Sequence, residues 1–255
     1  MVCILLLAIV LSAFPIGTAA GAAPTGWYVR RNSDGVQPAI DPQFSYVEGY
    51  NAHYVDKAHA DKSEDRVLYL TFDAGYENGN IEKILDIMKE EGVSGAFFIL
   101  DNLIRRNEGL VRRMAEEGHL VCNHTARHKD MTKIADKETF AAELSALEVL
   151  YRERIGKEMA KYYRPPEGRI SERSLAMAQE LGYTTVLWSL AYADWDNQRQ
   201  PAPEAAMKKI LENTHNGAII LLHPTSATNA AILRPLIKAW REMGYRFGTL
   251  DELTK

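Results

Sequence analysis

The 255-residue sequence contains few cysteines and has only a small net charge. Each of these features excludes some classes of protein. A formal net charge of −4 gives no reason to expect binding to nucleic acid. One of the two cysteines, Cys3, lies in an apolar N-terminal stretch. If that stretch is removed, Cys122 is the only thiol and no intramolecular disulfide can form. Cys122 ends the apolar run 120–122, which favours a small core residue over a nucleophile.

Residues 1–23 differ from the rest of the chain and resemble a signal peptide. Positions 2–16 are almost wholly apolar, and small residues follow at 17–23. The apolar part is too short to span a bilayer comfortably, although no Lys or Arg stands near the start. We expect cleavage after Ala20 or Ala23, and hence a secreted, extracytoplasmic protein that faces the cell wall; an uncleaved segment would act as an anchor. No later segment is apolar enough to span a membrane.

Two further parts follow the expected signal peptide. Residues 24–64 are polar and aromatic, with scattered glycine, proline and asparagine, and are predicted to pack on the main domain as an extension. The length of 255 residues suffices for one large α/β domain or two small ones with a sizeable core, and residues 65–255 are predicted to form the main domain. The aromatic residues of the extension are expected to be packing anchors and not ligand contacts: Trp27, Tyr28, Tyr46, Tyr50 and Tyr54.

From residue 65 onward, segments typical of strands and of helices alternate. The predicted strands are 67–72, 95–100, 120–123, 161–164, 184–188, 218–222 and 245–249. The predicted helices are 80–91, 108–117, 137–154, 172–181, 203–213 and 228–243. Such alternation is typical of a parallel sheet with crossover helices. About seven repeats predict an α/β fold, a distorted and incomplete (β/α) barrel.

Ionisable residues follow five of the predicted strands. They are Asp73 after the first, His124 and His128 after the third, Arg164 and Glu167 after the fourth, Asp194 after the fifth and His223 after the sixth. The active sites of such barrels gather at the carboxyl ends of the strands. We therefore expect these side chains to lie together at one rim.

His124 and His128 are four residues apart, so on a helical turn both imidazoles would face one side. Directly after a buried strand, this spacing favours a divalent-metal site over a solvated helix face. Zinc suits imidazole ligands. His223 closes the apolar run 218–222 and is either a satisfied core residue or a general acid. The other four histidines are expected to be structural: His53, His59, His119 and His215.

These side chains together indicate metal-assisted hydrolysis. The Asp73 carboxylate would take a proton from water at the metal, and a histidine would protonate the leaving group. Arg164 can pair with Asp73 and hold it ionised. Gly75 and Gly168 allow close backbone approach, and backbone N–H groups near Glu167 are candidates to stabilise an oxyanion.

Five motifs in this order resemble those of carbohydrate esterase family 4, the polysaccharide deacetylases with a NodB homology domain. They are T-F-D at 71–73, H-T-x-x-H at 124–128, R-P-P-x-G at 164–168, D-W at 194–195 and L-L-H at 221–223. The resemblance covers residues 65–253. It implies a distorted (β/α) barrel and an enzyme that hydrolyses carbon–nitrogen bonds other than peptide bonds.

The resemblance also implies roles for the catalytic residues. Asp73 would be the general base, oriented by Arg164. His223 would be the general acid, tuned by Asp194.

For the metal, the resemblance implies that His124 and His128 are ligands of a divalent ion, zinc by preference, with manganese and cobalt as alternatives. The residues expected to contact the substrate are Trp195, Leu221, Glu167 and Gly168. Of these, Trp195 and Leu221 would line the pocket for the acetyl methyl group.

Three positions depart from the family pattern. Ala74 stands where most members carry a second aspartate, which is their third metal ligand. Glu167 replaces the aromatic residue of R-P-P-Y-G, and Ala191 replaces the first aspartate of D-x-x-D-W. The expected metal site therefore has two histidines plus water or substrate, and binds metal more weakly than three-ligand sites.

A subgroup of the family departs in a similar way. The segment 71–79, the segment 188–195 and Tyr-Asn-Ala-x-Tyr at 50–54 resemble the spore-cortex peptidoglycan deacetylases of endospore formers. That resemblance implies removal of acetyl from N-acetylmuramic acid in peptidoglycan glycan strands, followed by closure to muramic δ-lactam during sporulation. We expect a monomer without a protein partner.

Two alternatives stay open. The first keeps the chemistry but takes N-acetylglucosamine in peptidoglycan or chitin oligomers as substrate. The second is a glycan-binding protein without catalysis, which Ala74 suggests.

Overall fold

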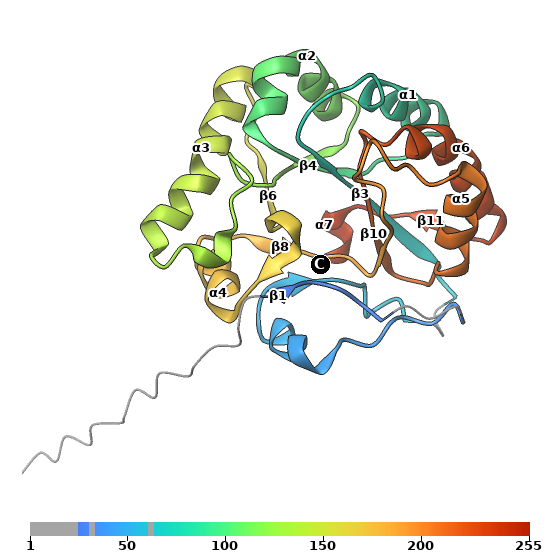
Figure 1. Ribbon diagram of the computed structural model, residues 1–255, viewed down its shortest axis with the longest axis horizontal. Coiled ribbons are helices and arrows are strands. Elements are labelled where there is room, and N and C mark those ends of the chain that lie inside the picture. The colour runs from blue at the N-terminus through green and yellow to red at the C-terminus, as the bar shows by residue number, and fades with distance from the viewer. Residues whose placement is uncertain (1–24, 31–33, 61–63) are drawn as a thin grey trace, which may run out of the picture.

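The computed structural model describes residues 25–30, 34–60 and 64–255, and the expected signal peptide at 1–23 lies outside them. Figure 1 shows helices arranged around a curled sheet. The strands of this sheet are β2 (Ala52–His53), β3 (Val67–Ala74), β4 (Ala96–Ile99), β5 (Leu120–Asn123), β6 (Ala160–Tyr163), β8 (Thr184–Val186), β9 (Leu190–Ala191), β10 (Ala218–Leu222) and β11 (Arg246–Phe247). A second, two-stranded sheet pairs β1 (Thr25–Gly26) with β7 (Arg169–Ile170).

The strands of the main sheet are all parallel. Their order is β2, β8, β6, β5, β4, β3, β10, β9, with β11 also paired to β3. Among the described residues β2 and β9 end this order, so the barrel is incomplete, as predicted. All seven predicted strands are present. The structure adds β2 and β9, two-residue strands too short for their pattern to be recognised in the sequence.

The helices are α1 (Ile81–Glu91), α2 (Asp101–Glu116), α3 (Lys137–Ile155), α4 (Glu172–Glu180), α5 (Pro203–Glu212), α6 (Ala227–Glu242) and α7 (Leu250–Leu253). Short 3₁₀ turns lie at Pro42–Gly49, Met131–Lys133 and Pro166–Gly168. The predicted start of α2 at residue 108 is wrong, because the helix begins directly after β4. A kink at Asn107 interrupts its pattern, and the burial of Leu103 and Ile104 stabilises the first turns. In the described part of the chain, no helix combines the length and apolar character needed to cross a membrane.

Strand β3 separates the two main parts of the core. Leu68, Leu70 and Phe72 pack in a buried cluster with the surrounding helices, whereas Val67 and Tyr69 belong to a second buried cluster. Because alternate side chains of a strand face opposite sides, residue 73 is in phase with Val67 and Tyr69. The sheet therefore directs Asp73 away from the helix-side core.

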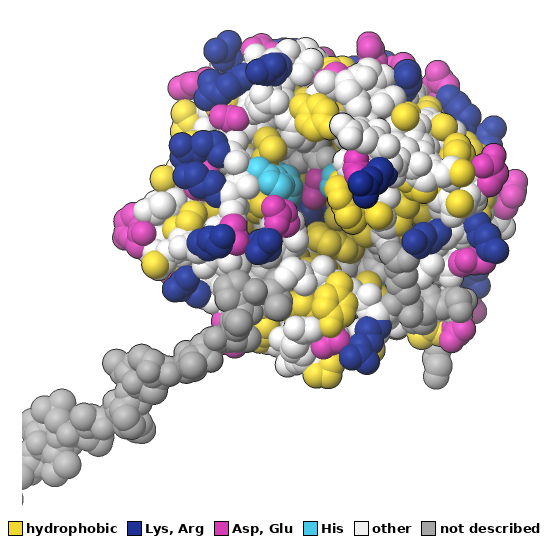
Figure 2. Space-filling model, viewed as in Figure 1, with side chains coloured by type: hydrophobic (Ala, Val, Ile, Leu, Met, Phe, Trp, Pro, Cys, Tyr) yellow, Lys and Arg dark blue, Asp and Glu magenta, His cyan; other side chains and the backbone are white. Residues whose placement is uncertain are grey.

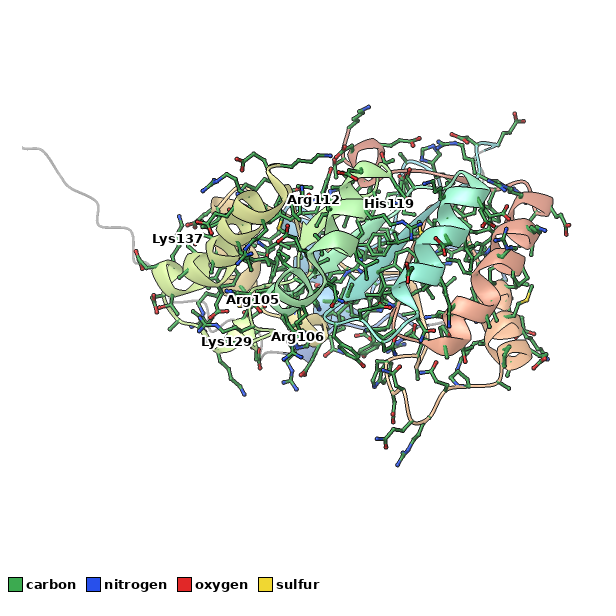
Figure 3. The ribbon with its side chains drawn as sticks, turned by 90° about the horizontal axis from the view of Figure 1, so that it is seen from above. Arg105, Arg106, Arg112, His119, Lys129 and Lys137 are labelled. Atoms are coloured by element: carbon green, nitrogen blue, oxygen red, sulfur yellow. The ribbon has the colours of Figure 1, made fainter. Side chains whose placement is uncertain are left out.

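The strands also give the barrel two unlike ends. Figure 3 shows His119, which precedes β5, toward one side of the molecule and Lys129, which follows β5, toward the other. The carboxyl ends of the parallel strands gather on the side of Lys129.

Residues from the N-terminal part of the chain pack on the barrel beside β8. Trp27, Phe44 and Tyr54 form a buried cluster with Ile170 and Leu187. Strand β2 pairs with β8 and so extends the sheet. In Figure 1 this part is the blue ribbon lying along one side of the sheet.

Candidate active site

A pocket of about 880 Å³ opens where the carboxyl ends of the strands meet. Figure 2 shows it as a hollow with histidine, acidic and apolar side chains around it. Eight of the ten predicted site residues line it: Asp73, His124, His128, Glu167, Gly168, Trp195, Leu221 and His223. The other two, Arg164 and Asp194, are wholly buried and contact Asp73 and His223.

Asp73 forms an ion pair with Arg164, whose Nη1 donates to Asp73 Oδ1 at 2.9 Å. Three further N–H groups of Arg164 donate to Thr71 Oγ1 at 2.8 Å and to the carbonyls of Val186 and Leu187 at 2.9 and 3.2 Å. The guanidinium is therefore fixed in orientation. Burial favours a raised pKa for the Asp73 carboxyl, but the charges of Arg164, His124 and His223 and the hydrogen bond from Arg164 together outweigh it, and the pKa is lowered. The carboxylate is ionised at neutral pH.

The two candidate metal ligands lie on a loop. The predicted helical turn is wrong, because Thr125 and His128 have φ angles of 72° and 55°, which no right-handed helix contains. Side-chain hydrogen bonds support this conformation: Asn123 Oδ1 accepts the Thr125 N–H at 2.8 Å, and Thr125 Oγ1 accepts the His128 N–H at 2.9 Å. The loop nevertheless brings the rings of His124 and His128 to 4.9 Å between centroids.

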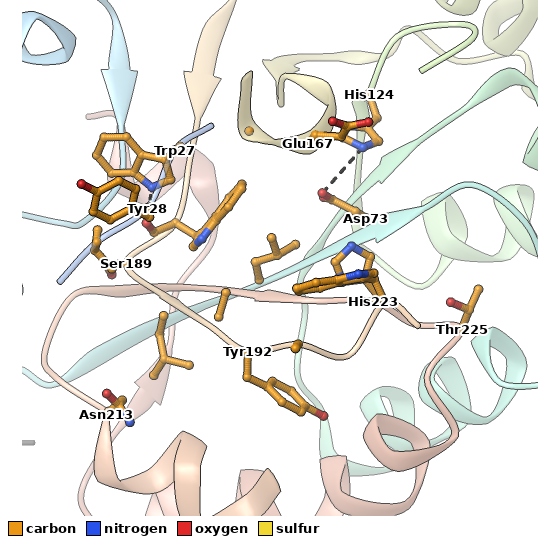
Figure 4. Close-up of a pocket in the computed structure, with 18 of the residues that line it drawn as sticks. Trp27, Tyr28, Asp73, His124, Glu167, Ser189, Tyr192, Asn213, His223 and Thr225 are labelled. Atoms are coloured by element: carbon orange, nitrogen blue, oxygen red, sulfur yellow. Dashed lines mark hydrogen bonds and ion pairs between the residues drawn. The ribbon is translucent and has the colours of Figure 1, made fainter. Parts of the chain in front are cut away.

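His124 has the tautomer that a metal ligand requires. Its Nδ1 donates to the Arg164 carbonyl at 2.9 Å, which leaves the lone pair on Nε2. Nε2 lies 3.6 Å from Asp73 Oδ2, the contact dashed in Figure 4. Burial lowers the pKa of His124 to about 4, so the ring is neutral at pH 7. The donor chemistry of this ring therefore fits a divalent metal.

The third ligand position differs from the first two. Ala74 is wholly buried in the helix-side cluster with Phe72 and does not line the pocket. Within the described ranges, no group of three or more His, Cys, Asp or Glu side chains is arranged to hold a metal ion. The two histidines thus fit a metal that takes its further ligands from water or substrate.

His223 is held by a buried carboxylate. Its Nδ1 donates to Asp194 Oδ1 at 2.7 Å, and Asn229 Nδ2 donates to Asp194 Oδ2 at 2.6 Å. Burial opposes protonation of His223, but the hydrogen bond with Asp194 and the charges of Asp194 and Asp73 outweigh it and raise the pKa of His223. With Nδ1 engaged, Nε2 is the nitrogen left for a substrate.

The segment after β6 approaches the pocket closely. Gly168 has a φ of 63°, and a Cβ there would lie 2.6 Å from Cη2 of Trp188, so only glycine fits. The Gly168 N–H already donates to the Pro165 carbonyl at 3.0 Å, so this amide is not free for an oxyanion. Glu167 also has a positive φ, of 54°, and its carboxylate pairs with Arg169 at 2.7 Å.

Apolar and aromatic groups complete the pocket. Trp195 is 63% exposed, and its ring centroid lies 6.3 Å from that of His223. Leu221 is buried in β10 and contributes to the pocket wall.

The pocket also includes residues for which the sequence predicts structural roles. Tyr28, predicted to be only a packing anchor, is 44% exposed and lines the pocket. Trp27 is buried, as expected of an anchor, but its Nε1 donates to the Trp188 carbonyl at 2.8 Å at the edge of the pocket (Figure 4). His215 also lines the pocket. Neither Tyr28 nor His215 follows a strand predicted from the sequence, so strand-end position could not identify them.

Comparisons with known proteins agree with this geometry. The family described as polysaccharide deacetylase matches residues 60–186. An uncharacterized 30.6 kDa protein of Geobacillus stearothermophilus is 40% identical over 232 residues, which cover 90% of this chain and 85% of that protein. The peptidoglycan-N-acetylmuramic acid deacetylase PdaA of Bacillus subtilis is 36% identical over 232 residues, with 90% and 86% covered.

Comparison of the fold with solved structures points to the same family. The structure of Bacillus subtilis PdaA, a family 4 carbohydrate esterase, matches with a TM-score of 0.84 at 35% identity and covers 90% of this chain and 96% of that one. The chain therefore belongs to the polysaccharide deacetylases of carbohydrate esterase family 4, and it is a hydrolase.

Proposed function

We propose that this protein removes the N-acetyl group of N-acetylmuramic acid in peptidoglycan glycan strands, outside the cytoplasmic membrane, leading to muramic δ-lactam. The observation that carries the proposal is the pair of opposed groups in one pocket: Asp73, held ionised by Arg164, and His223, held by Asp194. The name of the relative PdaA states this substrate, and the likeness to PdaA covers 90% of the chain.

In the proposed mechanism, Asp73 is the general base and His223 the general acid. Asp73 takes a proton from a water molecule while the oxygen of that water bonds to the acetyl carbonyl carbon. The carbon–nitrogen bond then breaks while His223 Nε2 gives its proton to the leaving nitrogen. The products are acetate and the free amine. Arg164 lowers the pKa of Asp73 and Asp194 raises that of His223, so the ionised carboxylate and the protonated imidazole that these two roles require are both favoured.

His124 and His128 would hold a divalent metal, for which zinc is the best match and manganese and cobalt are alternatives. When bound, such an ion polarises an amide carbonyl and makes water more acidic. The His124 ring, fixed through Nδ1 by the Arg164 carbonyl, is oriented for this purpose without further movement.

The pocket walls offer groups that suit a sugar with an acetamido substituent. Leu221 and Trp195 supply apolar surface for the acetyl methyl group. Tyr28, Tyr76 and Trp195 are exposed aromatic rings in the pocket lining, on which a sugar ring can pack. The polysaccharide would lie across this face of the molecule.

A second candidate, deacetylation of N-acetylglucosamine, is favoured by Glu167. Its carboxylate lines the pocket, and Lys209 is the only Lys or Arg among the described residues that line it. The lactyl carboxylate of muramic acid would be repelled by Glu167, whereas the neutral N-acetylglucosamine would not. The third alternative, glycan binding without catalysis, has less support, because both charged pairs of the site are intact.

The test is a comparison of two substrates. Purified protein is incubated with amidase-treated glycan strands or with chitin oligomers, with added zinc, manganese or cobalt, and acetate is assayed. Mass spectrometry of the glycan fragments then locates the lost acetyl group and any lactam closure. Release from muramic acid with no release by Asp73→Asn is expected. No release from either substrate with any of the metals would contradict a deacetylase.

We also propose that residues 1–23 direct export, that 24–64 are an extension on the catalytic domain, and that 65–255 are that domain. The buried cluster around Trp27 and the pairing of β2 with β8 support the second assignment. N-terminal sequencing of the protein recovered from outside the membrane would locate the cleavage site. Gel filtration is expected to give a monomer.

A further inference from the structure

One glutamate of α3 anchors the loop that carries both candidate metal-binding histidines. Glu143 accepts hydrogen bonds from Arg127 Nη2 at 2.5 Å and is paired with Lys129 Nζ at 2.6 Å. These two cations stand on either side of His128 in the sequence. The Glu143 side chain is 2% exposed, whereas those of Arg127 and Lys129 are 62% and 48% exposed. Two exposed cations of the loop therefore bind one buried carboxylate of α3.

The backbone of the same residue also binds the loop. The carbonyl of Glu143 accepts the N–H of Ala126 at 3.0 Å. The next carbonyl of α3, that of Leu144, accepts from Asn123 Nδ2 at 3.0 Å. Helix α3 thus holds the loop at its beginning, middle and end.

This support matters because the loop conformation is intrinsically unfavourable. Thr125 and His128 both have positive φ angles, a region that β-branched residues such as threonine rarely adopt. Such conformations persist only where the surrounding structure enforces them. A loop released from α3 would relax, and the 4.9 Å approach of the His124 and His128 rings would be lost.

We propose that Glu143 is a positioning residue for the metal site: through Arg127 and Lys129 it fixes the loop on which His124 and His128 face one another. This inference rests on the proposed function, since it assumes that the two histidines hold a metal. Glu143 itself lies outside the pocket lining and acts on the histidines only through the loop. Its charge is essential, because without it two cations beside His128 repel each other with no buried anion to draw them together.

The competing explanation is that Glu143 is an ordinary structural ion pair. Glu91 provides a matched control for it. The Glu91 side chain is 11% exposed and binds two cations of another element, Arg234 at 2.8 Å and Arg241 at 2.9 Å, where α1 meets α6. The variants Glu143→Gln and Glu91→Gln make the same chemical change, but only the first touches the histidine loop.

The experiment is a calorimetric titration of the full chain with zinc alone, for wild type, Glu143→Gln and Glu91→Gln, with thermal unfolding in EDTA alongside. We expect Glu143→Gln to raise the zinc Kd by about tenfold or more, which is the usual effect of losing a group that orients metal ligands. We expect Glu91→Gln to lower the unfolding temperature and leave the zinc Kd unchanged.

Zinc binding by Glu143→Gln as tight as that of wild type would overturn the inference, and so would equal weakening in Glu91→Gln. If Glu143→Gln does not fold, Arg127→Gln replaces it, because Lys129 still neutralises Glu143 in that variant. A raised Kd in Arg127→Gln supports the inference, and an unchanged Kd overturns it. Absence of zinc binding by wild type would overturn the metal site and this inference together. Zinc binding without acetate release would count against the proposed function alone.

Discussion

Asp194 binds His223 at two points: Oδ1 accepts from Nδ1 at 2.7 Å, and Oδ2 accepts from the His223 backbone N–H at 2.8 Å. Both the ring and the main chain of His223 are therefore fixed by one buried carboxylate. This arrangement sets the tautomer of the ring and raises its pKa.

The first prediction concerns this pair. Asp194→Asn removes the charge that raises the pKa of His223, so the protonated ring is lost at a lower pH. A general acid must be protonated, so activity declines once the pH rises past its pKa. In Asp194→Asn this decline should begin at a lower pH than in wild type. At neutral pH we expect kcat to drop by about 10²-fold or more. The measurement is a pH profile of acetate release.

Asp196→Asn is the matched control for this profile. Asp196 lies two residues along the same loop, and its side chain is 46% exposed and pairs with Arg199. Its profile should coincide with that of wild type. A profile for Asp194→Asn with an unshifted basic limb would contradict the role given to Asp194.

The second prediction concerns Arg164, which is wholly buried. Arg164→Lys keeps the charge but loses the planar set of donors that bind Asp73, Thr71 and two carbonyls. We expect a loss of about 3 kcal/mol in unfolding free energy and a large loss of activity. Urea unfolding and acetate assays measure the two effects.

Arg169→Lys tests the same exchange at an exposed ion pair. Arg169 is 45% exposed and pairs with Glu167, so its effect on stability should stay below about 1 kcal/mol. If Arg164→Lys were as mild as Arg169→Lys, the fixed guanidinium would not be needed to hold Asp73.

The strands and their end residues could be predicted from the sequence because both signals are local. Residues 67–72 form a mostly apolar run, and Asp73 follows it in phase with the side chains of Val67 and Tyr69. His223 directly follows the buried strand β10 in the same way. Parallel strands bring such ends together whatever the loops do, so all ten predicted site residues meet at one rim.

The parts that could not be predicted depend on contacts distant in the chain. Tyr28 reaches the pocket only because the N-terminal segment packs beside β8, more than 150 residues away in sequence. The conformation between His124 and His128 is set by Asn123 and by Glu143 on the following helix, which override the spacing typical of a helical turn. Helix α2 starts early because Leu103 and Ile104 are buried.

The third prediction concerns Ala74, where most family members carry a metal-binding aspartate. Here Ala74 is wholly buried in the helix-side apolar cluster. In EDTA, Ala74→Asp should therefore lose about 1–3 kcal/mol in unfolding free energy, because its carboxyl would be buried among the apolar side chains of this cluster. Thermal or urea unfolding measures this loss.

Ala191→Asp is the control, since Ala191 lines the pocket and is only half-buried. It restores the other family aspartate and should be tolerated. Unchanged stability of Ala74→Asp in EDTA would mean that the new carboxylate turns into the pocket, and zinc titration would then show tighter binding.

The fourth prediction concerns Glu167 and substrate charge. Glu167→Gln removes a carboxylate from the pocket and breaks its 2.7 Å ion pair with Arg169, which keeps a second pair with Asp130 at 3.5 Å. We expect kcat/KM on glycan strands with a free lactyl carboxylate to rise about fivefold, equivalent to about 1 kcal/mol. The same variant should act on chitin oligomers at the wild-type rate, since they carry no carboxylate. Equal changes on both substrates would contradict an electrostatic role.

The last prediction concerns His119, at the opposite end of the barrel from the pocket (Figure 3). His119 is 6% exposed, and its Nδ1 accepts the N–H of Gly95 at 3.2 Å. Burial lowers the pKa of His119 to about 4. In the unfolded chain the pKa is about 6.5, so between these values the unfolded state binds the extra proton and stability falls as pH falls. The contribution of neutral His119 to the free energy of unfolding is fully present above about pH 6.5 and is lost toward pH 4.

For this one group, the loss in unfolding free energy between pH 7 and pH 5 is about 2 kcal/mol. His119→Gln keeps an acceptor for Gly95 but cannot titrate. Urea unfolding at the two pH values should therefore show that the unfolding free energy falls by about 2 kcal/mol less in His119→Gln than in wild type. Because His119 is remote from the pocket, acetate release at neutral pH should not change in this variant. An equal drop in both proteins would mean that His119 becomes protonated without unfolding, and that burial does not hold the ring neutral.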